Sequence, residues 1–319
     1  MQTGGIGMSL EFFADSKDME KNYRMFGVNA RALYEKTGFV FAMIKEILNT
    51  SKLTDEKRLH EILSEQKSRT QMRLTAAGHS TTALRSMAYF SESSAISDLT
   101  SGIAYYELLE ELDKNFEEKK AFLIEKLQGL MKLIFRQDNL ILSVTAEEMG
   151  LKGIDTELAG LKEVLAAPSE DFAAKSETEE KLANGKKNEG FQTSAKIQYV
   201  TRSGNYRNAG FAYTGALRIL KVILSYEYLW MNVRVKGGAY GCMSGFGRNG
   251  DAYFSSYRDP NLRKTNEIYE GVPEYVENFT VEEYEELFEK MKDGEIKVDR
   301  DYEKGLKNEN FPNVNLDII

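Results

Sequence analysis

The feature that most constrains the fold is an apolar helical segment followed by a Gly-Gly break and two alternating stretches. Residues 212–233 contain no proline and carry apolar side chains over more than half of the expected helix circumference. This pattern predicts a helix buried on more than one side. Gly237 and Gly238 end it, and residues 239–246 and 252–257 alternate as strands do. We therefore expect side chains from the helix end and the strand start to share one cleft. The apolar positions expected along the helix include Leu217, Leu220, Leu224, Tyr228 and Met231.

The first half of the chain is predicted to be rich in helices, because no proline occurs before Pro168. Helical spacing predicts four helices, with Thr54 as the N-cap of the second. Alternation predicts a strand near the N-terminus and another after the last of these helices. The expected helices are 18–48, 54–77, 81–90 and 109–134, the strands are 8–12 and 140–144, and 91–101 is a polar stretch.

The second half is predicted to contain a strand at 195–201 with a turn at 204–205, a hairpin turn at 248–251, another turn at 257–261 and a charged helix at 281–292. Strands and helices do not alternate one-for-one, so an α+β fold with antiparallel sheets is favoured over a parallel α/β fold. The expected domains are 1–164 and 191–319, joined by a polar linker at 165–190.

Composition narrows the function classes. Of 319 residues, 42% are hydrophobic and 29% are charged, as is typical of a soluble globular protein. The net charge of −8 argues against nucleic-acid binding, which needs a basic face. No run approaches the roughly 20 apolar residues that span a bilayer. The N-terminus lacks the pattern of a signal peptide, so a cytoplasmic location is expected.

The two histidines, His60 and His79, do not form a zinc motif. His60 begins the run His60-Glu61-Ile62-Leu63-Ser64, and the second histidine of a His-Glu-x-x-His pair would stand where Ser64 does. The inverted His-x-x-Glu-His pattern is also missing from the sequence. His60 is therefore interpreted as a surface histidine, and His79 as a helix cap or a residue at a domain contact. The sequence predicts no complete zinc site in this chain.

Other common catalytic motifs are also missing. The single cysteine, Cys242, excludes an internal disulfide and a thiolate zinc cluster, and it is interpreted as a small buried side chain. No Gly-x-Ser-x-Gly elbow is present, although composition alone does not exclude a Ser-His-Asp triad. Residues 237–241 lack the spacing, the lysine and the hydroxyl of a phosphate-binding loop.

Arg234 and Tyr240 are the remaining candidates, six positions apart on either side of the glycine pair. Converging guanidinium and phenol groups could bind a peptide carbonyl or the oxyanion that develops from it. Gly237 and Gly238 would let an extended backbone approach closely. Both side chains also have structural interpretations: an arginine favoured at a helix C-terminus, and a strand tyrosine that is buried with its hydroxyl paired.

Several motifs give the chain a family resemblance over roughly residues 3–280. It resembles the C-terminal half of presequence proteases, in the pitrilysin and insulinase family of inverted-motif zinc metallopeptidases. The motifs that carry the resemblance are Gly210-Phe211-Ala212-Tyr213-Thr214-Gly215, Val233-Arg234-Val235-Lys236-Gly237-Gly238-Ala239-Tyr240-Gly241, Ser255-Ser256-Tyr257-Arg258-Asp259-Pro260-Asn261 and Gly78-His79-Ser80.

The resemblance implies two halves, each of two related α+β domains, closed around a peptide chamber. Zinc and the catalytic glutamate would lie in an N-terminal half, and Arg234 and Tyr240 would reach the substrate from this half. The chain is then expected to start inside the third domain, without its opening strand and helix, and to have a divergent or truncated end.

Two hypotheses follow. In the first, the chain is the substrate-binding half of a zinc metalloendopeptidase for short unstructured peptides and is inactive alone. Its partners are an N-terminal zinc-binding half and a peptide, with neither nucleic acid nor membrane. In the second, it is a non-catalytic peptide-binding or assembly subunit, and Arg234 and Tyr240 are structural.

Overall fold

The chain forms two compact units of mixed helix and sheet. The computed structural model describes residues 3–14, 22–168, 185, 187–193 and 196–280, together with residues 282, 283, 285, 286 and 289. The first unit comprises the described parts of Met1–Ala77 and Ser91–Lys186, and the second those of Gly78–Phe90 and Lys187–Ile319. Each unit contains an antiparallel sheet with helices, so the predicted α+β class is confirmed. The domain boundaries expected from the sequence stay a prediction.

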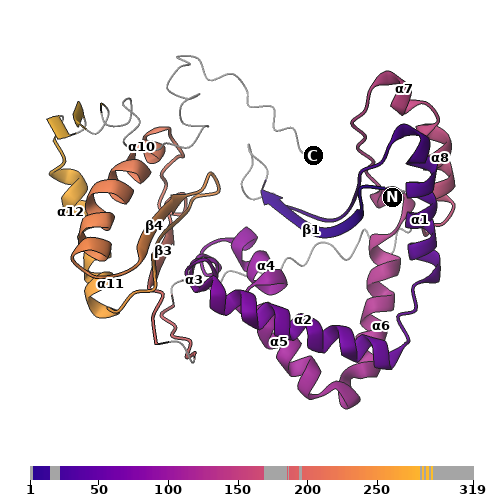
Figure 1. Cartoon of the computed structure of the whole chain (residues 1–319), viewed down its shortest axis with the longest axis horizontal. Helices are drawn as coiled ribbons and strands as arrows, with labels where there is room; N and C mark the ends of the chain where they lie inside the picture. Colours follow the sequence, from indigo (N-terminus) through magenta and orange to yellow (C-terminus); the bar gives the residue numbers. More distant parts are fainter. Residues whose placement is uncertain are drawn as a thin grey trace. The chain divides into compact units, whose positions relative to one another are not determined.

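The first unit begins with an antiparallel pair of strands, β1 (Ile6–Ala14) and β2 (Asn22–Ala30), in a register that pairs Ile6 with Ala30 (Figure 1). Strand β1 matches the strand expected near residues 8–12. The helix expected over 18–48 is wrong for its first half, because residues 22–30 form β2. There Phe26, Val28 and Ala30 alternate, and pairing with β1 supplies the backbone hydrogen bonds.

Helices make up most of the rest of the first unit. They are α1 (Thr37–Thr50), α2 (Glu56–Ala76), α4 (Glu92–Ser101), α5 (Ile103–Lys114), α6 (Phe116–Ile134), α7 (Glu148–Leu151) and α8 (Ile154–Lys162), with short 3₁₀ turns η1 (Tyr34–Lys36) and η2 (Gln137–Asn139). Helix α2 packs against α5, where Leu63, Leu109 and Phe116 form the buried core of these helices. The amphipathic stripes of the sequence therefore serve as core faces, as expected.

Three details of these helices differ from expectation. Helix α2 is capped by the Asp55 carboxylate, which accepts from the Arg58 N–H, and not by Thr54. The long helix expected over 109–134 is broken at Asn115. The polar stretch 91–101 is helix α4, because its polar side chains bond locally: Ser91 caps it, and Asp98 accepts from the Ile103 N–H.

The strand expected over 140–144 is wrong, since these residues have no regular secondary structure. A strand needs a partner, and the nearby pairing is a single parallel bridge between Arg136 and Ala166. Most of the linker expected at 165–190, and most of the charged helix expected at 281–292, lie outside the described residues.

The second unit is built on a three-stranded antiparallel sheet in the order β3-β5-β4: β3 (Thr201–Asn205), β4 (Gly241–Phe246) and β5 (Asp251–Tyr257). The β4–β5 hairpin turns at residues 248–251 as expected, with Gly250 at φ 94°. Strand β3 starts six residues later than expected. The turn follows Asn205, whose side chain accepts from the N–H groups of Arg207 and Asn208.

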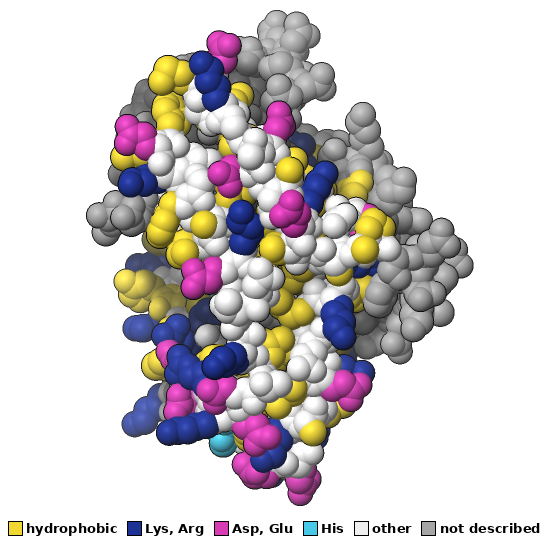
Figure 2. Space-filling model, turned by 90° about the vertical axis from the view of Figure 1, so that its right-hand side faces the viewer, with side chains coloured by type: hydrophobic (Ala, Val, Ile, Leu, Met, Phe, Trp, Pro, Cys, Tyr) yellow, Lys and Arg dark blue, Asp and Glu magenta, His cyan; other side chains and the backbone are white. Residues whose placement is uncertain are grey.

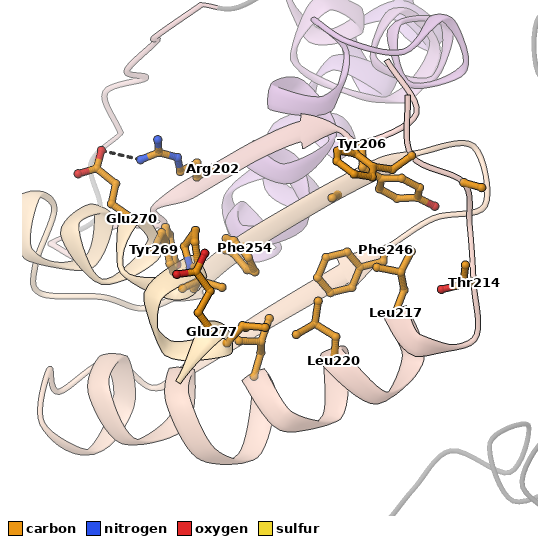
Figure 3. A pocket seen from close by; sticks show the side chains of 17 residues that line it. Arg202, Tyr206, Thr214, Leu217, Leu220, Phe246, Phe254, Tyr269, Glu270 and Glu277 are labelled. Atoms are coloured by element: carbon orange, nitrogen blue, oxygen red, sulfur yellow. Dashed lines mark hydrogen bonds and ion pairs between the residues drawn. The ribbon is translucent and has the colours of Figure 1, made fainter. Parts of the chain in front are cut away.

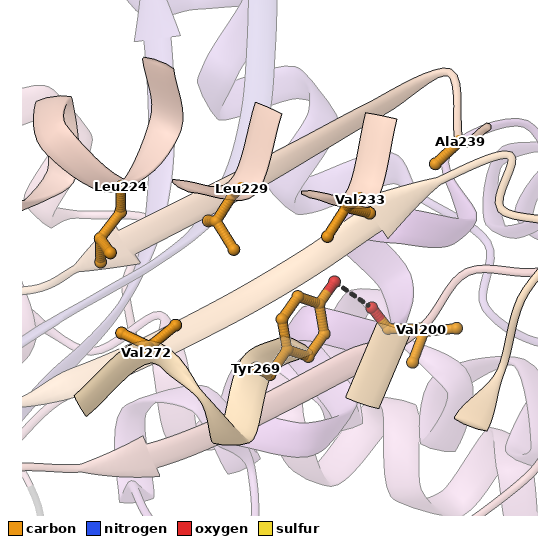
Figure 4. Packing of buried hydrophobic residues seen from close by; sticks show 7 residues of the cluster. All are labelled: Val200, Leu224, Leu229, Val233, Ala239, Tyr269 and Val272. Atoms are coloured by element: carbon orange, nitrogen blue, oxygen red, sulfur yellow. Dashed lines mark hydrogen bonds between the residues drawn. The ribbon is translucent and has the colours of Figure 1, made fainter. Parts of the chain in front are cut away.

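Helices cover both faces of this sheet (Figure 1). Helix α3 (Gly78–Met87) lies against β3 and β5 on one face. The other face is packed by α10 (Ala216–Ile223), by its continuation through η3 (Leu224–Tyr228) and η4 (Trp230–Val235), and by α11 (Arg263–Glu270) and α12 (Val272–Glu277). The core on this face comprises Val200, Leu224, Leu229, Val233, Ala239, Tyr269 and Val272 (Figure 4).

The helix that leads to the Gly-Gly break is α-helical only in its first part. Segments η3 and η4 are π-helical, with bonds such as Leu229 N–H to Leu224 O. The wider turn places Leu224, Leu229 and Val233 on one face, all 0% exposed. Met231, expected in the core from α-helical spacing, is instead 40% exposed.

The exposed surface and the helices fit the exclusions made from composition. On the face drawn in Figure 2, acidic and basic side chains lie interspersed with hydrophobic ones. Within the described ranges, no helix combines the length and the apolar character needed to cross a membrane.

Candidate functional site

The structure brings Arg234 and Tyr240 together at the end of η4. The guanidinium carbon of Arg234 lies 5.3 Å from the centre of the Tyr240 ring and 4.3 Å from that of Trp230. Such cation–π contacts each contribute about 0.5–1 kcal/mol at exposed sites. Among the described residues, no carboxylate lies within ion-pair distance of Arg234. Its N–H groups are therefore held between two rings, without an acidic partner in that part of the chain.

The Gly-Gly turn is built for a sharp reversal. Gly238 has φ +81° and donates its N–H to the Arg234 carbonyl at 2.8 Å, which is the left-handed type of helix C-cap. A Cβ on Gly237 would lie 2.4 Å from the Val233 carbonyl oxygen, so only glycine fits. The Gly237 carbonyl in turn accepts from the Asn261 side chain at 2.6 Å. Neither glycine is free to move without disturbing its neighbours.

Tyr240 is fixed through its backbone and exposed through its ring. Its N–H donates to the Tyr257 carbonyl at 3.0 Å, and its ring meets the Tyr257 ring edge-on at 5.7 Å. The side chain is nevertheless 64% exposed. The buried-tyrosine interpretation considered from the sequence does not match this exposure, because the ring can reach a ligand from solvent.

The loop after β5 holds both sides of the turn. Arg258 takes φ +51°, a left-handed conformation uncommon for a residue other than glycine, and its guanidinium lies 5.4 Å from the Tyr257 ring centre. The fully buried Asp259 carboxylate accepts from the Asn261 N–H at 2.8 Å and from the Thr265 hydroxyl at 2.7 Å. Strain at Arg258 is thus maintained by a buried hydrogen-bond network.

Comparisons with known proteins agree with this half of a site. A family model for the segment associated with peptidases of family M16, subfamily C, matches residues 1–112, and the model described as "PreP C-terminal domain" matches residues 188–307. Protein HypA of Clostridium perfringens is 34% identical over 285 residues, covering 89% of this chain and 29% of that protein. The chain is a presequence-protease-like member of the M16 peptidase family.

Two presequence proteases support the same assignment. Presequence protease 1, chloroplastic/mitochondrial, of Arabidopsis thaliana is 25% identical over 257 residues, which are 80% of this chain and 23% of that protein. The mitochondrial presequence protease of Saccharomyces cerevisiae is 24% identical over 296 residues, with 87% of this chain and 29% of that protein covered. This presequence-protease-like chain spans less than a third of these relatives' length. The family match also runs to residue 307, which corrects the expectation that the resemblance ends near residue 280.

The residues of this chain do not fit a zinc ion. Within the described ranges, no group of three His, Cys, Asp or Glu side chains could hold a metal. His60 lies in the first unit, stacked on Phe116 at 4.1 Å with its Nε2 3.3 Å from Asp113. His79 lies in the second unit, in the first turn of α3. No catalytic step through a metal can be derived from these side chains.

Cys242 is not a nucleophile either. Burial raises the pKa of its thiol to about 11, so the thiol stays protonated at neutral pH. Its sulfur lies 3.7 Å from the Tyr269 hydroxyl in the core of the second unit. The interpretation of Cys242 as a small core side chain agrees with this environment.

A hollow of about 1130 Å³ lies elsewhere in the second unit (Figure 3). Its walls are mostly apolar side chains of α10, α12 and the sheet, among them Leu217, Leu220 and Phe254. An ion pair between Arg202 and Glu270, at 2.7 Å, lies on its lining. None of the predicted site residues lines it, so its size does not make it the candidate site.

Sequence reasoning missed Trp230, Tyr257 and His79 as parts of the site. Trp230 stands four positions before Arg234, a spacing that brings side chains together on a helix and could have indicated the pair. Tyr257 lies at the end of β5, next to the start of β4 where Tyr240 lies. His79 carries no local signal for this place, because it comes from a distant part of the sequence.

Proposed function

We propose that the chain is the substrate-binding half of a zinc metalloendopeptidase that degrades short unstructured peptides. The pairing of Arg234 with the exposed Tyr240 carries this proposal. The guanidinium and the phenol would bind the scissile carbonyl and stabilise the oxyanion that develops from it. Gly237 and Gly238 would let the peptide backbone pass close to the turn.

The catalytic machinery that this chain lacks belongs to its proposed partner. A zinc-binding half, in the same natural chain or in a separate subunit, would supply the metal and the general base. The chain alone would then have no peptidase activity. Zinc-dependent, chelator-sensitive cleavage of a peptide by the pure 319-residue protein would refute this division of labour. The cytoplasmic location stays a prediction, to be tested by cell fractionation.

The test of the two residues uses an enzyme reconstituted from this chain and a zinc-binding half. Removing one oxyanion donor typically lowers kcat by about 10²–10³. We expect a loss of this size for Tyr240→Phe and for Arg234→Ala, measured with an unstructured peptide. Circular dichroism and the unfolding midpoint would show that each variant remains folded.

A second arginine–tyrosine pair in the same unit is a matched control. Arg248 lies 5.6 Å from the Tyr213 ring centre, beyond the end of β4 opposite to Tyr240. Arg248→Ala and Tyr213→Phe should leave cleavage within about twofold. If the site variants also stay within about twofold, under about 0.5 kcal/mol, the non-catalytic peptide-binding or assembly role is favoured instead.

A further inference from the structure

Helix α3 belongs to the second unit, although the helices before and after it in the sequence fold into the first. It is attached to the sheet by polar bonds near its N-terminus. The Ser255 hydroxyl donates to the His79 carbonyl at 3.0 Å, and the Thr82 and Thr201 hydroxyls lie 2.7 Å apart. These bonds set the place of His79 over the end of β5.

Close packing fixes the same end of α3. The Tyr199 ring lies so near to Gly78 that a Cβ there would be 2.3 Å from it. The Tyr199 and His79 ring centres are 6.4 Å apart. Because Gly78 carries no side chain, the ring of Tyr199 can lie against the first turn of the helix, and the His79 ring is held beside it.

A chain of ring contacts leads from His79 to Tyr240. The His79 and Tyr257 rings meet edge to face, at 4.9 Å and 80°, and the Tyr257 and Tyr240 rings do so at 5.7 Å and 73°. Tyr257 also contacts Tyr199 at 5.7 Å and the Arg258 guanidinium. Edge-to-face pairs prefer a restricted geometry, so the place of each ring limits that of the next.

His79 takes part as a neutral ring. Its Nδ1 is buried and has no hydrogen-bond partner among the described residues. Burial lowers the pKa of the imidazole, since an imidazolium would lose its hydration there. The ring therefore acts here through its packing against Tyr257 and not as a cation.

We propose that His79 is a positioning residue for Tyr240, acting through the ring of Tyr257. A segment from the first half of the sequence thereby determines where the exposed phenol lies. The placement of Tyr240 can be measured without the proposed function, and only the consequence for peptide cleavage rests on it.

The test places 3-fluorotyrosine at position 240 of the 319-residue protein and follows its ¹⁹F resonance. We expect His79→Ala to shift or broaden the resonance, and His79→Phe to restore most of it because an aromatic ring remains. His60→Ala is the matched control, since His60 also stacks on a ring but in the first unit. An unchanged resonance in folded His79→Ala, or an equal change in His60→Ala, overturns the proposal.

A measurement on the unsubstituted protein covers the case in which His79→Ala does not fold. With selectively labelled aromatic rings, cross-relaxation should connect His79 with Tyr257 and Tyr257 with Tyr240. The lack of either contact overturns the proposal.

Peptide cleavage by the reconstituted enzyme separates this inference from the proposed function. If His79 acts through Tyr240, His79→Ala should lower kcat in the wild type but have no further effect in Tyr240→Ala. Additive losses would contradict the inference. A Tyr240 resonance that responds to His79 in an enzyme insensitive to Tyr240→Phe would refute the proposed function and leave the positioning intact.

Discussion

The two units differ in how completely they bury the groups that fix their shape. The first unit packs amphipathic helices around Leu63, Leu109 and Phe116, and its acidic cluster at Asp113 stays in contact with solvent. The second unit encloses its sheet between helices and buries the Asp259 carboxylate completely. The unit that carries Arg234 and Tyr240 is thus the one in which backbone and charge have least freedom. Equivalent substitutions in the two units should therefore have unequal effects.

The largest difference is expected for the two aspartates. Asp259→Ala leaves the Asn261 N–H and the Thr265 hydroxyl without their acceptor inside the second unit. We expect it to lower the free energy of unfolding by about 3 kcal/mol. Asp113→Ala removes partly solvated contacts with Lys67 and His60, and should cost about 1 kcal/mol. Urea unfolding of both variants measures the difference, and equal losses would contradict the comparison.

The same Gly→Ala change should have opposite signs in the two units. At Gly237 the new Cβ would meet the Val233 carbonyl at 2.4 Å, and overpacking of this kind costs about 2 kcal/mol. At Gly129, inside α6, a Cβ meets nothing within 4 Å. Alanine is the better helix former there, so Gly129→Ala should stabilise the protein by about 1 kcal/mol. Unfolding midpoints that move in the same direction for both variants would contradict this prediction.

The smallest expected effect concerns the ion pair that attaches α3 within the second unit. Arg85 donates to the Glu189 carboxylate from Nε at 2.8 Å and from Nη2 at 3.2 Å, and this bonding lowers the pKa of Glu189 to about 2. The folded pKa is below the unfolded value of about 4.3. The contribution to stability is therefore complete above the unfolded pKa and is lost as the pH falls towards 2.

Glu189→Gln tests this pair. The variant should be less stable than the wild type by about 1 kcal/mol at pH 7, as for a partly exposed ion pair. The difference should shrink as the pH falls from the unfolded pKa towards the folded one, as measured by chemical denaturation at several pH values. A difference that does not vary with pH would show that the Glu189 charge contributes nothing to the attachment of α3.

Local signals in the sequence were enough for several elements. Helix α2 and the β4–β5 hairpin follow from capping, periodicity and turn residues, which act within a few positions. The same holds for the glycine break that ends η4. Elements whose stability depends on a distant partner were missed: β2 needs β1, and β3 begins only where β5 pairs with it.

The sequence by itself determined the α+β class, the family resemblance, and the choice of Arg234 and Tyr240 as candidates. Only the tertiary structure decided which side chains surround them. The π-helical turns of η3 and η4 bury Leu229 and Val233 and leave Trp230 and Met231 exposed, which α-helical spacing does not predict. The packing of α3 on β5 brings His79 to Tyr257 from a distant part of the sequence. Both outcomes depend on packing between elements, and no local pattern encodes it.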